Sequence, residues 1–583
     1  MNYSKLSPTL AQALDDYQAA GRPGLAGHTD LMGLVTAVEE SPKPARIVMF
    51  LHCDENLPRD AFADLGVELN SDSGSVRTGI VPLDALDALT ESAAVEQVVP
   101  GRYLEPLMDV AGPRIGIPDL RDSGLTGSGV LIGIVDTGID VKNPGFEGRV
   151  LRTWDQTLPG PGVPEGEYGA EFTGPLMQVA QDTIGHGTHV AGIAASADPT
   201  YTGVAPEADI VMVKSDLMTV HIADGIRYLF RVAEEMGRPA VVNLSLGGHG
   251  DAHDGTDSLS AIIDAASGPG RIVCCAAGNE GNDPIHAQVD VNDGSMRTIS
   301  CMVAVPKPGQ EPVIATFNGW YEGGDQMEIA VVSPSGASTP YQAVITDGSP
   351  SRTYNVPDGQ VRIVTPGPDP ANGDHGFLVQ VLSAPAANTP KPHSWKIKIK
   401  GEAVADGRVD IWTVRASTAI FTGVAVKDSV KVGSPGCASA AVTVASYTTK
   451  NAWFDFMGGG PYETGEDVED ISSFSSEGPR RDGVKKPEVA APGSVIASAL
   501  SSHSAVSPRI LIDPWNRINQ GTSMACPFVA GLVALLLQRD PKLGPDEVKD
   551  LLRDNSKIPK KRKGSWDPKW GYGLVDARGL SQG

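Results

Sequence analysis

Between residues 127 and 282, apolar runs of strand length alternate with segments of helical periodicity, and this alternation constrains the fold more than any other feature of the chain. Strands that are apolar on both faces and are each followed by a helix are typical of a parallel sheet covered on both sides. We therefore expect an α/β domain with a parallel sheet and helices on both of its faces. The runs that carry the pattern are VLIGIVD, HGTHVAGIAAS, ADIVMVK, ADGIRYLFRVAEEMG, AVVNLSLGG, SLSAIIDAAS and RIVCCAAGN.

A different pattern interrupts the alternation after Gly281. Segments such as QMEIAVVSPSG, GFLVQVLSA and SWKIKIKGEA are short, alternate apolar with polar residues, and are separated by Gly, Pro, Asn and Asp turns. This pattern predicts an inserted all-β sandwich or jelly roll over residues 283–429. The α/β pattern resumes at AAVTVASY, so the main domain is expected over residues 113–282 and 430–583.

The N-terminal part of the chain carries its own small elements. A chain of 583 residues is too long for one core, and several domains are expected. Residues 1–44 are polar and punctuated by Gly and Pro, which predicts a partly helical extension. Residues 45–112 are expected to form an α+β domain of split βαβ type. Its expected strands are ARIVMFLHC, GVELN, VRTGIVP and VEQVVP, and its expected helices are PRDAFADL and LDALDALTES.

The composition is that of an ordinary globular protein, with 41% hydrophobic and 20% charged residues. A formal net charge of −24 disfavours a nucleic-acid partner. No apolar run approaches the ~18 residues that span a bilayer, and the N-terminus is unlike a secretory signal, so we expect no membrane partner and a cytoplasmic location. Six scattered cysteines without a C-x-x-C pair fit a reducing compartment, and we expect neither a metal nor a cofactor.

Three short motifs carry candidate chemistry. In GIVDTGID (133–140), Asp136 ends an apolar strand, where a carboxylate can orient an imidazole away from water. In GHGTHVAG (185–192), His186 stands at the expected start of a helix. In GTSMACPFVAG (521–531), Ser523 begins a helix, whose N-terminus favours developing negative charge. A serine nucleophile needs a base, and the base needs a third group that fixes its tautomer. We therefore assign Ser523 as nucleophile, His186 as general base and Asp136 as the orienting acid.

These motifs identify the chain as similar to the subtilisin-like serine peptidases, in which the triad follows the order Asp, His, Ser. The resemblance covers residues 113–282 and 430–575 and includes the further blocks NLSLGG, AAGNEG, FSSEGP and KPEVAAPG. The insertion stands where clostridial spore-germination proteases carry a jelly roll. Phe528 replaces the usual His of the serine block and is expected to pack in the helix. The segment after HGTHVAG is too short for the calcium loop of secreted bacterial subtilisins, so calcium is expected to matter little.

The resemblance implies roles for further residues. Asn279 and the Ser523 N–H would form the oxyanion hole. Ser245, Leu246 and Gly247 would form the edge strand that pairs with the substrate backbone. The wall of the S1 pocket would consist of Ala276, Ala277 and Gly278, with Gly433 at its floor leaving room for a large side chain. His189 and Cys526 are expected to be packed residues and Asp182 a loop cap, while His286 is expected to be a solvated loop histidine, with a place in the cleft as the alternative.

The α+β unit at 45–112 resembles the family's inhibitory propeptide. The joining segment RYLEPLMDVAGP would then pass the active site and be cut once, with Leu104 or Leu107 in the S1 pocket. The expected function is a serine endopeptidase made as a self-processed zymogen, whose partners are a protein or peptide substrate and its own propeptide; the sequence names no activator protein. A tripeptidyl-type exopeptidase and a regulatory adaptor that acts through the inserted β-domain are the alternatives.

Overall fold

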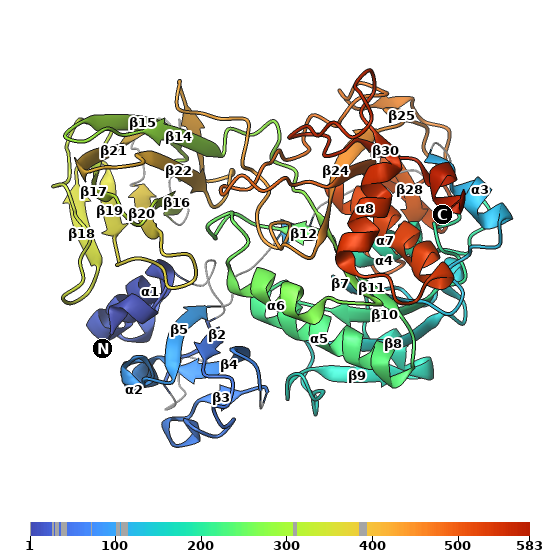
Figure 1. The fold of residues 1–583 in the computed structure, drawn as a ribbon, viewed down its shortest axis with the longest axis horizontal. Helices are drawn as coiled ribbons and strands as arrows, with labels where there is room; N and C mark the ends of the chain where they lie inside the picture. Colours follow the sequence, from blue (N-terminus) through green and yellow to red (C-terminus); the bar gives the residue numbers. More distant parts are fainter. Residues whose placement is uncertain are drawn as a thin grey trace.

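The computed structural model describes residues 2–25, 28, 34–35, 44–71, 73–100, 105–106, 115–306, 312–383 and 393–582. Three parts are visible in Figure 1: an α/β part on the right, a group of antiparallel strands at the upper left, and an N-terminal unit at the lower left. The N-terminal unit contacts both of the others, through α1 against β18 and β20 and through β4 against α5 and α6.

The α/β part is built on a ten-stranded sheet that is parallel from β31 to β8. Its two edge strands, β30 and β9, run antiparallel to their neighbours, so the sheet is mixed at its edges rather than wholly parallel as expected. The strands lie in the order β30 (Ser556–Lys557), β31 (Leu574–Val575), β27 (Val489–Ser494), β24 (Val442–Thr448), β13 (Arg271–Ala276), β11 (Ala240–Leu244), β7 (Leu131–Asp136), β10 (Asp209–Lys214), β8 (Val150–Asp155) and β9 (Ala170–Thr173).

Helices cover both faces of this sheet, as the alternating sequence predicts. Along β7 every residue is buried, with Ile132 and Ile134 in one hydrophobic cluster and Leu131 and Val135 in the other. The first cluster contains side chains of α3 (Ile117–Asp122), α4 (His186–Ala195), α7 (Thr522–Arg539) and α8 (Pro545–Asp554). The second contains side chains of α5 (Thr219–Glu235) and α6 (Ser258–Ala266).

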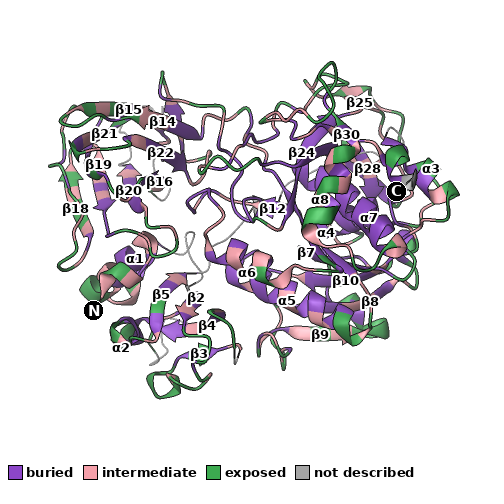
Figure 2. Ribbon diagram, in the orientation of Figure 1, coloured by how far each residue is buried: buried purple, intermediate pink, exposed green. Residues whose placement is uncertain are grey.

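Figure 2 shows the buried residues concentrated in the sheet and its covering helices. Among the described helices, α7 alone is long and apolar enough to cross a bilayer by length and composition, and 89% of its tested window is buried in the structure. Phe528 lies in α7 and packs in the first cluster, as predicted for this departure from the serine block.

The N-terminal unit has a small sheet in the order β1-β2-β4-β3, with β5 also paired to β2. The predicted helix at 58–65 is wrong: this stretch is mostly turn and ends in one 3-10 turn, Ala63–Leu65, that no side chain caps and that Gly66 closes in a left-handed conformation. Helix α1 shares one hydrophobic cluster with the strands, so the segment before residue 45 packs with them. The elements are α1 (Pro8–Ala20), β1 (Leu34–Val35), β2 (Arg46–Cys53), β3 (Glu68–Leu69), β4 (Val76–Pro82), α2 (Leu86–Glu91) and β5 (Val95–Pro100).

The strands inserted after β13 form two antiparallel sheets that pack through a shared hydrophobic cluster. The larger sheet has the order β14 (His286–Asp290), β22 (Arg408–Thr413), β16 (Val313–Tyr321), β20 (His375–Ser383), β19 (Gly359–Val364) and β18 (Ser351–Val356). The smaller has the order β17 (Gln326–Val332), β21 (His393–Ala403), β15 (Met296–Val303) and β23 (Ala419–Thr422). Three further ribbons pair β6 (Glu105–Pro106) with β12 (Leu246–Gly247), β25 (Ala452–Trp453) with β26 (Tyr462–Glu463), and β28 (Ile496–Ala499) with β29 (Asn516–Asn519).

Candidate active site

Asp136 and His186 meet at the carboxyl end of the sheet. Asp136 is the last residue of β7, His186 is the first residue of α4, and both are buried. The Nδ1 atom of His186 lies 2.7 Å from Oδ1 of Asp136. Gly187 permits this approach, because a Cβ at that position would lie 2.2 Å from the carbonyl oxygen of Gly138 and 3.1 Å from the Cβ of Asp136. The pair therefore has the geometry in which a carboxylate fixes the tautomer of an imidazole.

Asp182 holds the start of α4 in place. Its two carboxylate oxygens accept hydrogen bonds from the Gly185 N–H at 2.7 Å, from the Thr137 hydroxyl at 2.9 Å, and from the N–H and hydroxyl of Thr188 at 2.9 and 2.7 Å. The predicted loop cap is confirmed, and it satisfies amides that a helix N-terminus otherwise leaves without partners.

Ser523 lies in the first turn of α7, buried, beside the loop that follows β11. Its hydroxyl donates to the carbonyl oxygen of Ser245 at 2.9 Å, and the Ser245 hydroxyl donates to the carbonyl oxygen of Ser523 at 2.6 Å. These two bonds fix the nucleophile's loop against the predicted substrate strand.

Asn279 follows β13 and is oriented by the residue that precedes Ser523. Its Oδ1 accepts from the N–H of Thr522 at 2.8 Å and from the Thr522 hydroxyl at 3.0 Å. Because both bonds use the oxygen, the amide N–H groups of Asn279 are left as donors for another acceptor. Thr522 was not predicted from the sequence, although a hydroxyl directly before Ser523 is a signal that could have indicated it.

The predicted substrate strand is already paired. Leu246 and Gly247 form β12, which pairs antiparallel with Glu105 and Pro106 of β6, and Gly248 bridges to Ser434. Leu104 and Leu107, the predicted cleavage residues, lie outside the described residues. The backbone of β12 thus accepts an extended segment as a peptide substrate would be accepted in β-augmentation.

The model of the subtilase family matches residues 127–390 and 374–573, which together contain the motifs of Asp136, His186 and Ser523. The chain belongs to the subtilase family. The minor extracellular protease Vpr of Bacillus subtilis is 26% identical over 500 residues, which make up 82% of this chain and 54% of Vpr. The serine protease AprX of the same organism is 23% identical over 498 residues, 82% of this chain and 73% of AprX. The chain thus spans about half the length of Vpr and about three quarters of AprX.

A solved structure extends the similarity. The CspB protease of Clostridium perfringens matches with a TM-score of 0.65 and 25% identity, over 80% of this chain and 97% of that chain. The subtilisin-like fold expected from the sequence is therefore confirmed, and the chain is a member of a family of serine peptidases.

In this subtilase one of the predicted pocket residues contacts the segment of Ser523: the Gly278 N–H donates to the Thr522 hydroxyl at 3.2 Å. Ala276, Ala277 and Gly278 continue from the end of β13, and the Ala277 N–H donates to the Val444 carbonyl at 3.0 Å. At Gly433 a Cβ would lie 2.0 Å from the carbonyl oxygen of Gly248. The close approach of the neighbouring backbone thus requires glycine there, while the room for a large substrate side chain stays a prediction.

The other histidine and cysteine predictions had mixed outcomes. His189 is structural, as predicted: its Nε2 lies 3.1 Å from the Arg517 carbonyl, and burial together with the Arg517 charge holds its pKa well below the usual value. Cys526 is buried, and burial raises the pKa of its thiol, so it packs as expected. His286 is no solvated loop residue. It begins β14, is fully buried, and pairs with Asp410 at 2.9 Å, because the inserted strand carries it into a core.

Proposed function

We propose that this chain is a serine endopeptidase that works through an acyl-enzyme on Ser523. The observation that supports this most directly is the buried 2.7 Å contact between His186 and Asp136 at the carboxyl end of the sheet. Ser523 lies in the first turn of α7. Rotation of the Ser523 side chain away from the Ser245 carbonyl would direct its hydroxyl to Nε2 of His186. His186 then takes the hydroxyl proton as Oγ attacks the substrate carbonyl.

The oxyanion that forms would be stabilised by the Asn279 side-chain amide and the Ser523 N–H. Collapse of the tetrahedral intermediate breaks the peptide C–N bond, and the His186 imidazolium gives its proton to the leaving amine. Water then attacks the ester with His186 again as base, which releases the acid product and the free serine hydroxyl. The charge of Asp136 stabilises the imidazolium in both steps.

The test is labelling of the purified chain with a fluorophosphonate probe, followed by digestion of a long unstructured protein. Labelling that is lost in Ser523→Ala, together with internal cuts, supports the endopeptidase. Stepwise loss of short N-terminal peptides would favour the exopeptidase instead, and absence of labelling would favour an adaptor. In Asn279→Ala, kcat should fall by about 10²–10³ with little change in KM, a magnitude taken over from subtilisin.

The N-terminal unit is proposed to be an inhibitory propeptide that acts at this cleft. Its Val48 and Phe50 belong to the hydrophobic cluster of α5 and α6, and His52 lies 2.8 Å from the Ser258 hydroxyl at the start of α6. The neighbouring strand segment Glu105–Pro106 occupies the edge of β12, which a substrate would need. Both contacts support a unit that blocks the cleft while it remains bound.

Self-cleavage within residues 102–112 is proposed to convert the chain into a two-piece complex. Tethering makes the encounter intramolecular, so the rate should not depend on enzyme concentration. On a denaturing gel the wild type should resolve into two fragments, and Ser523→Ala should remain one 60.9 kDa chain. A fully active wild type that stays in one piece would contradict this proposal.

A cytoplasmic location is also proposed, for an enzyme whose natural substrates are proteins or peptides. All six cysteines are buried and free, which fits a reducing compartment.

Within the described parts of the chain, no cluster of three His, Cys, Asp or Glu residues could hold a metal ion. If the proposal of a metal-independent enzyme is correct, a chelator should leave the melting temperature nearly unchanged, because a ligand of the folded state would have raised it.

A further inference from the structure

Four aromatic rings form a stacked column between the active-site loops and the inserted strands. His249 stacks on His253 with ring centroids 5.2 Å apart, His253 stacks on Trp412 at 4.0 Å, and Trp412 stacks on His286 at 4.9 Å. The interplanar angles are 10°, 4° and 15°, so all four rings are nearly parallel. His253, Trp412 and His286 are fully buried and His249 is 8% exposed.

One end of the column reaches the loop of the proposed oxyanion residue. Nε2 of His249 lies 3.4 Å from Oε2 of Glu280, the residue after Asn279. The same carboxylate oxygen accepts the backbone N–H of Asn279 at 2.8 Å and the hydroxyl of Ser476 at 3.0 Å. It also packs beneath Gly278, where a Cβ would lie 2.8 Å from that oxygen. The Glu280 carboxylate therefore folds back on its own loop and fixes the backbone that carries Asn279.

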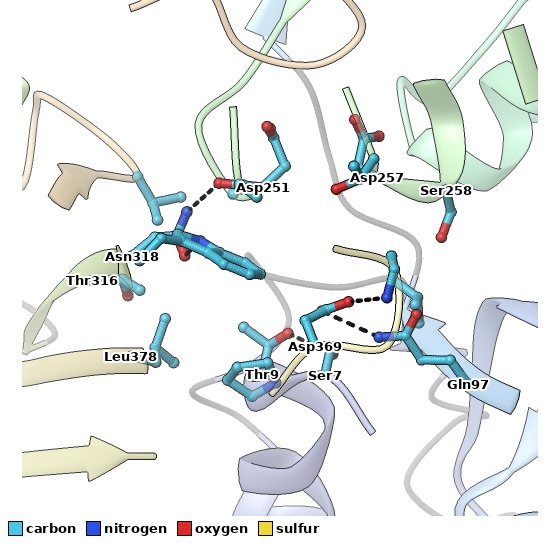
Figure 3. Close-up of a pocket in the computed structure, with 18 residues that line it drawn as sticks. Ser7, Thr9, Gln97, Asp251, Asp257, Ser258, Thr316, Asn318, Asp369 and Leu378 are labelled. Atoms are coloured by element: carbon cyan, nitrogen blue, oxygen red, sulfur yellow. Dashed lines mark hydrogen bonds between the residues drawn. The ribbon is translucent and has the colours of Figure 1, made fainter. Parts of the chain in front are cut away.

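The other end of the column is anchored in the inserted strands. Trp412 of β22 donates through its indole N–H to the Val430 carbonyl at 2.7 Å, and His286 of β14 pairs with Asp410 at 2.9 Å. Asn318 of β16 donates to the carbonyl of His249 at 3.2 Å and to that of Asp251 at 2.7 Å; the bond to Asp251 is drawn in Figure 3. The loop that carries His249 is thus held by two inserted strands, beside a cavity of about 90 Å³ where all three parts of the chain meet.

Stacking and one side-chain hydrogen bond hold His253, the ring in the middle of this column. Nδ1 of His253 lies 3.0 Å from the Val432 carbonyl, while its Nε2 and the Nδ1 of His249 are buried without a hydrogen-bond partner. Burial, with His249 and His286 nearby, keeps the pKa of His253 well below its usual value, so this ring stacks as a neutral imidazole. The flat face of Trp412 therefore lies behind His253 and supports, through it, the ring of His249.

We propose that His249 is a positioning residue for the oxyanion loop, and that Trp412 of the inserted strands holds it against Glu280. The inserted strands are then part of the support of the active site and not an independent appendage. This inference rests on the proposed function, because Asn279 must stabilise an oxyanion for its position to affect the rate. His249 itself touches no reacting atom.

The decisive experiment is a double-mutant cycle between His249→Phe and Asn279→Ala in the full chain, with peptide amide hydrolysis as the assay. Phe keeps a stacked ring and removes the nitrogen that meets Glu280. Alone, His249→Phe should lower kcat by about tenfold with KM changed less than twofold, because a loosened donor is misplaced mainly for the transition state. In the Asn279→Ala background it should lower kcat by less than about twofold, since the group it positions is absent. His249→Gln, whose amide can still donate to Glu280, should restore most of the lost rate.

A matched pair of buried tryptophans tests the role of the inserted strands. Trp412→Leu should reproduce the loss of His249→Phe, whereas Trp395→Leu, in the other inserted sheet and equally buried, should leave kcat within twofold at a temperature where both variants are folded. The inference is overturned if His249→Phe costs the same factor in both backgrounds, or if the two tryptophan variants lose equal activity. If Asn279→Ala has no effect on an active wild type, the proposed oxyanion role fails first and this inference falls with it.

Discussion

Replacing Asp182 by Ala should strongly destabilise the chain, because this side chain holds the start of α4. The side chain is fully buried, and its carboxylate accepts four hydrogen bonds, each of 2.9 Å or less. Each bond to a charged acceptor contributes about 1.5–3 kcal/mol, so four of them set an upper bound of about 6–12 kcal/mol. Water that enters the vacated space will restore part of this, and we expect a loss of about 3–6 kcal/mol.

The same change should also lower catalysis, because α4 begins at His186 and its first amides lose their acceptor. Stability is best measured by urea unfolding in the Ser523→Ala background, where self-digestion cannot occur, and kcat in the otherwise wild-type chain. Asp182→Asn is the matched control: its single carbonyl oxygen can serve about half of the donors, so its loss should be intermediate. A loss below about 1 kcal/mol for Asp182→Ala, with an unchanged kcat, would refute the argument that this carboxylate holds the helix start.

Three further predictions concern the proposed catalytic pair, a buried aspartate of α5, and the contact of the N-terminal unit with the inserted strands. Ser523→Ala and His186→Ala should each remove nearly all hydrolysis of a peptide amide, and the double variant should lose little more, whereas additive losses would show that the two do not act together; this rule of non-additivity itself comes from subtilisin. Burial raises the pKa of Asp224 from 3.8 to about 6. The ionised carboxylate therefore lowers the free energy of unfolding, and this loss is absent below pH 3.8 and complete above pH 6. Because one pKa unit corresponds to about 1.4 kcal/mol, the stability of Asp224→Asn relative to wild type should rise by up to about 3 kcal/mol between pH 4 and 7 in calorimetry, and a pH-independent difference would contradict this. Arg362 of the inserted strands binds Asp16 of α1 through two contacts, one of 2.6 Å. Arg362→Ala should therefore speed dissociation of the cleaved N-terminal piece by about tenfold. The charge-reversed pair of Arg362→Asp with Asp16→Arg should slow this dissociation again.

The sequence alone predicted the α/β architecture, which the structure confirms, and the residues of the proposed catalytic triad. Buried strands such as β7 are apolar up to their last residue because both faces of the sheet are covered, and this pattern can be recognised without knowledge of contacts. The residues of the proposed triad stand in short local motifs, and at Gly187 close backbone approach requires the glycine of the motif. Features of this kind depend on residues that are close together in the sequence, so the sequence alone was enough to predict them.

Only the tertiary structure decided which distant residues meet. The expectation that His286 is a solvated loop histidine was wrong. Its partners Trp412 and Asp410 lie more than 120 positions away, and the sequence around His286 does not indicate them. The close approach of the Gly248 backbone to Gly433 is likewise visible only in the folded chain. Long-range packing and the burial of charges depend on how separate parts of the chain dock, and that is a property of the folded molecule that no local pattern encodes.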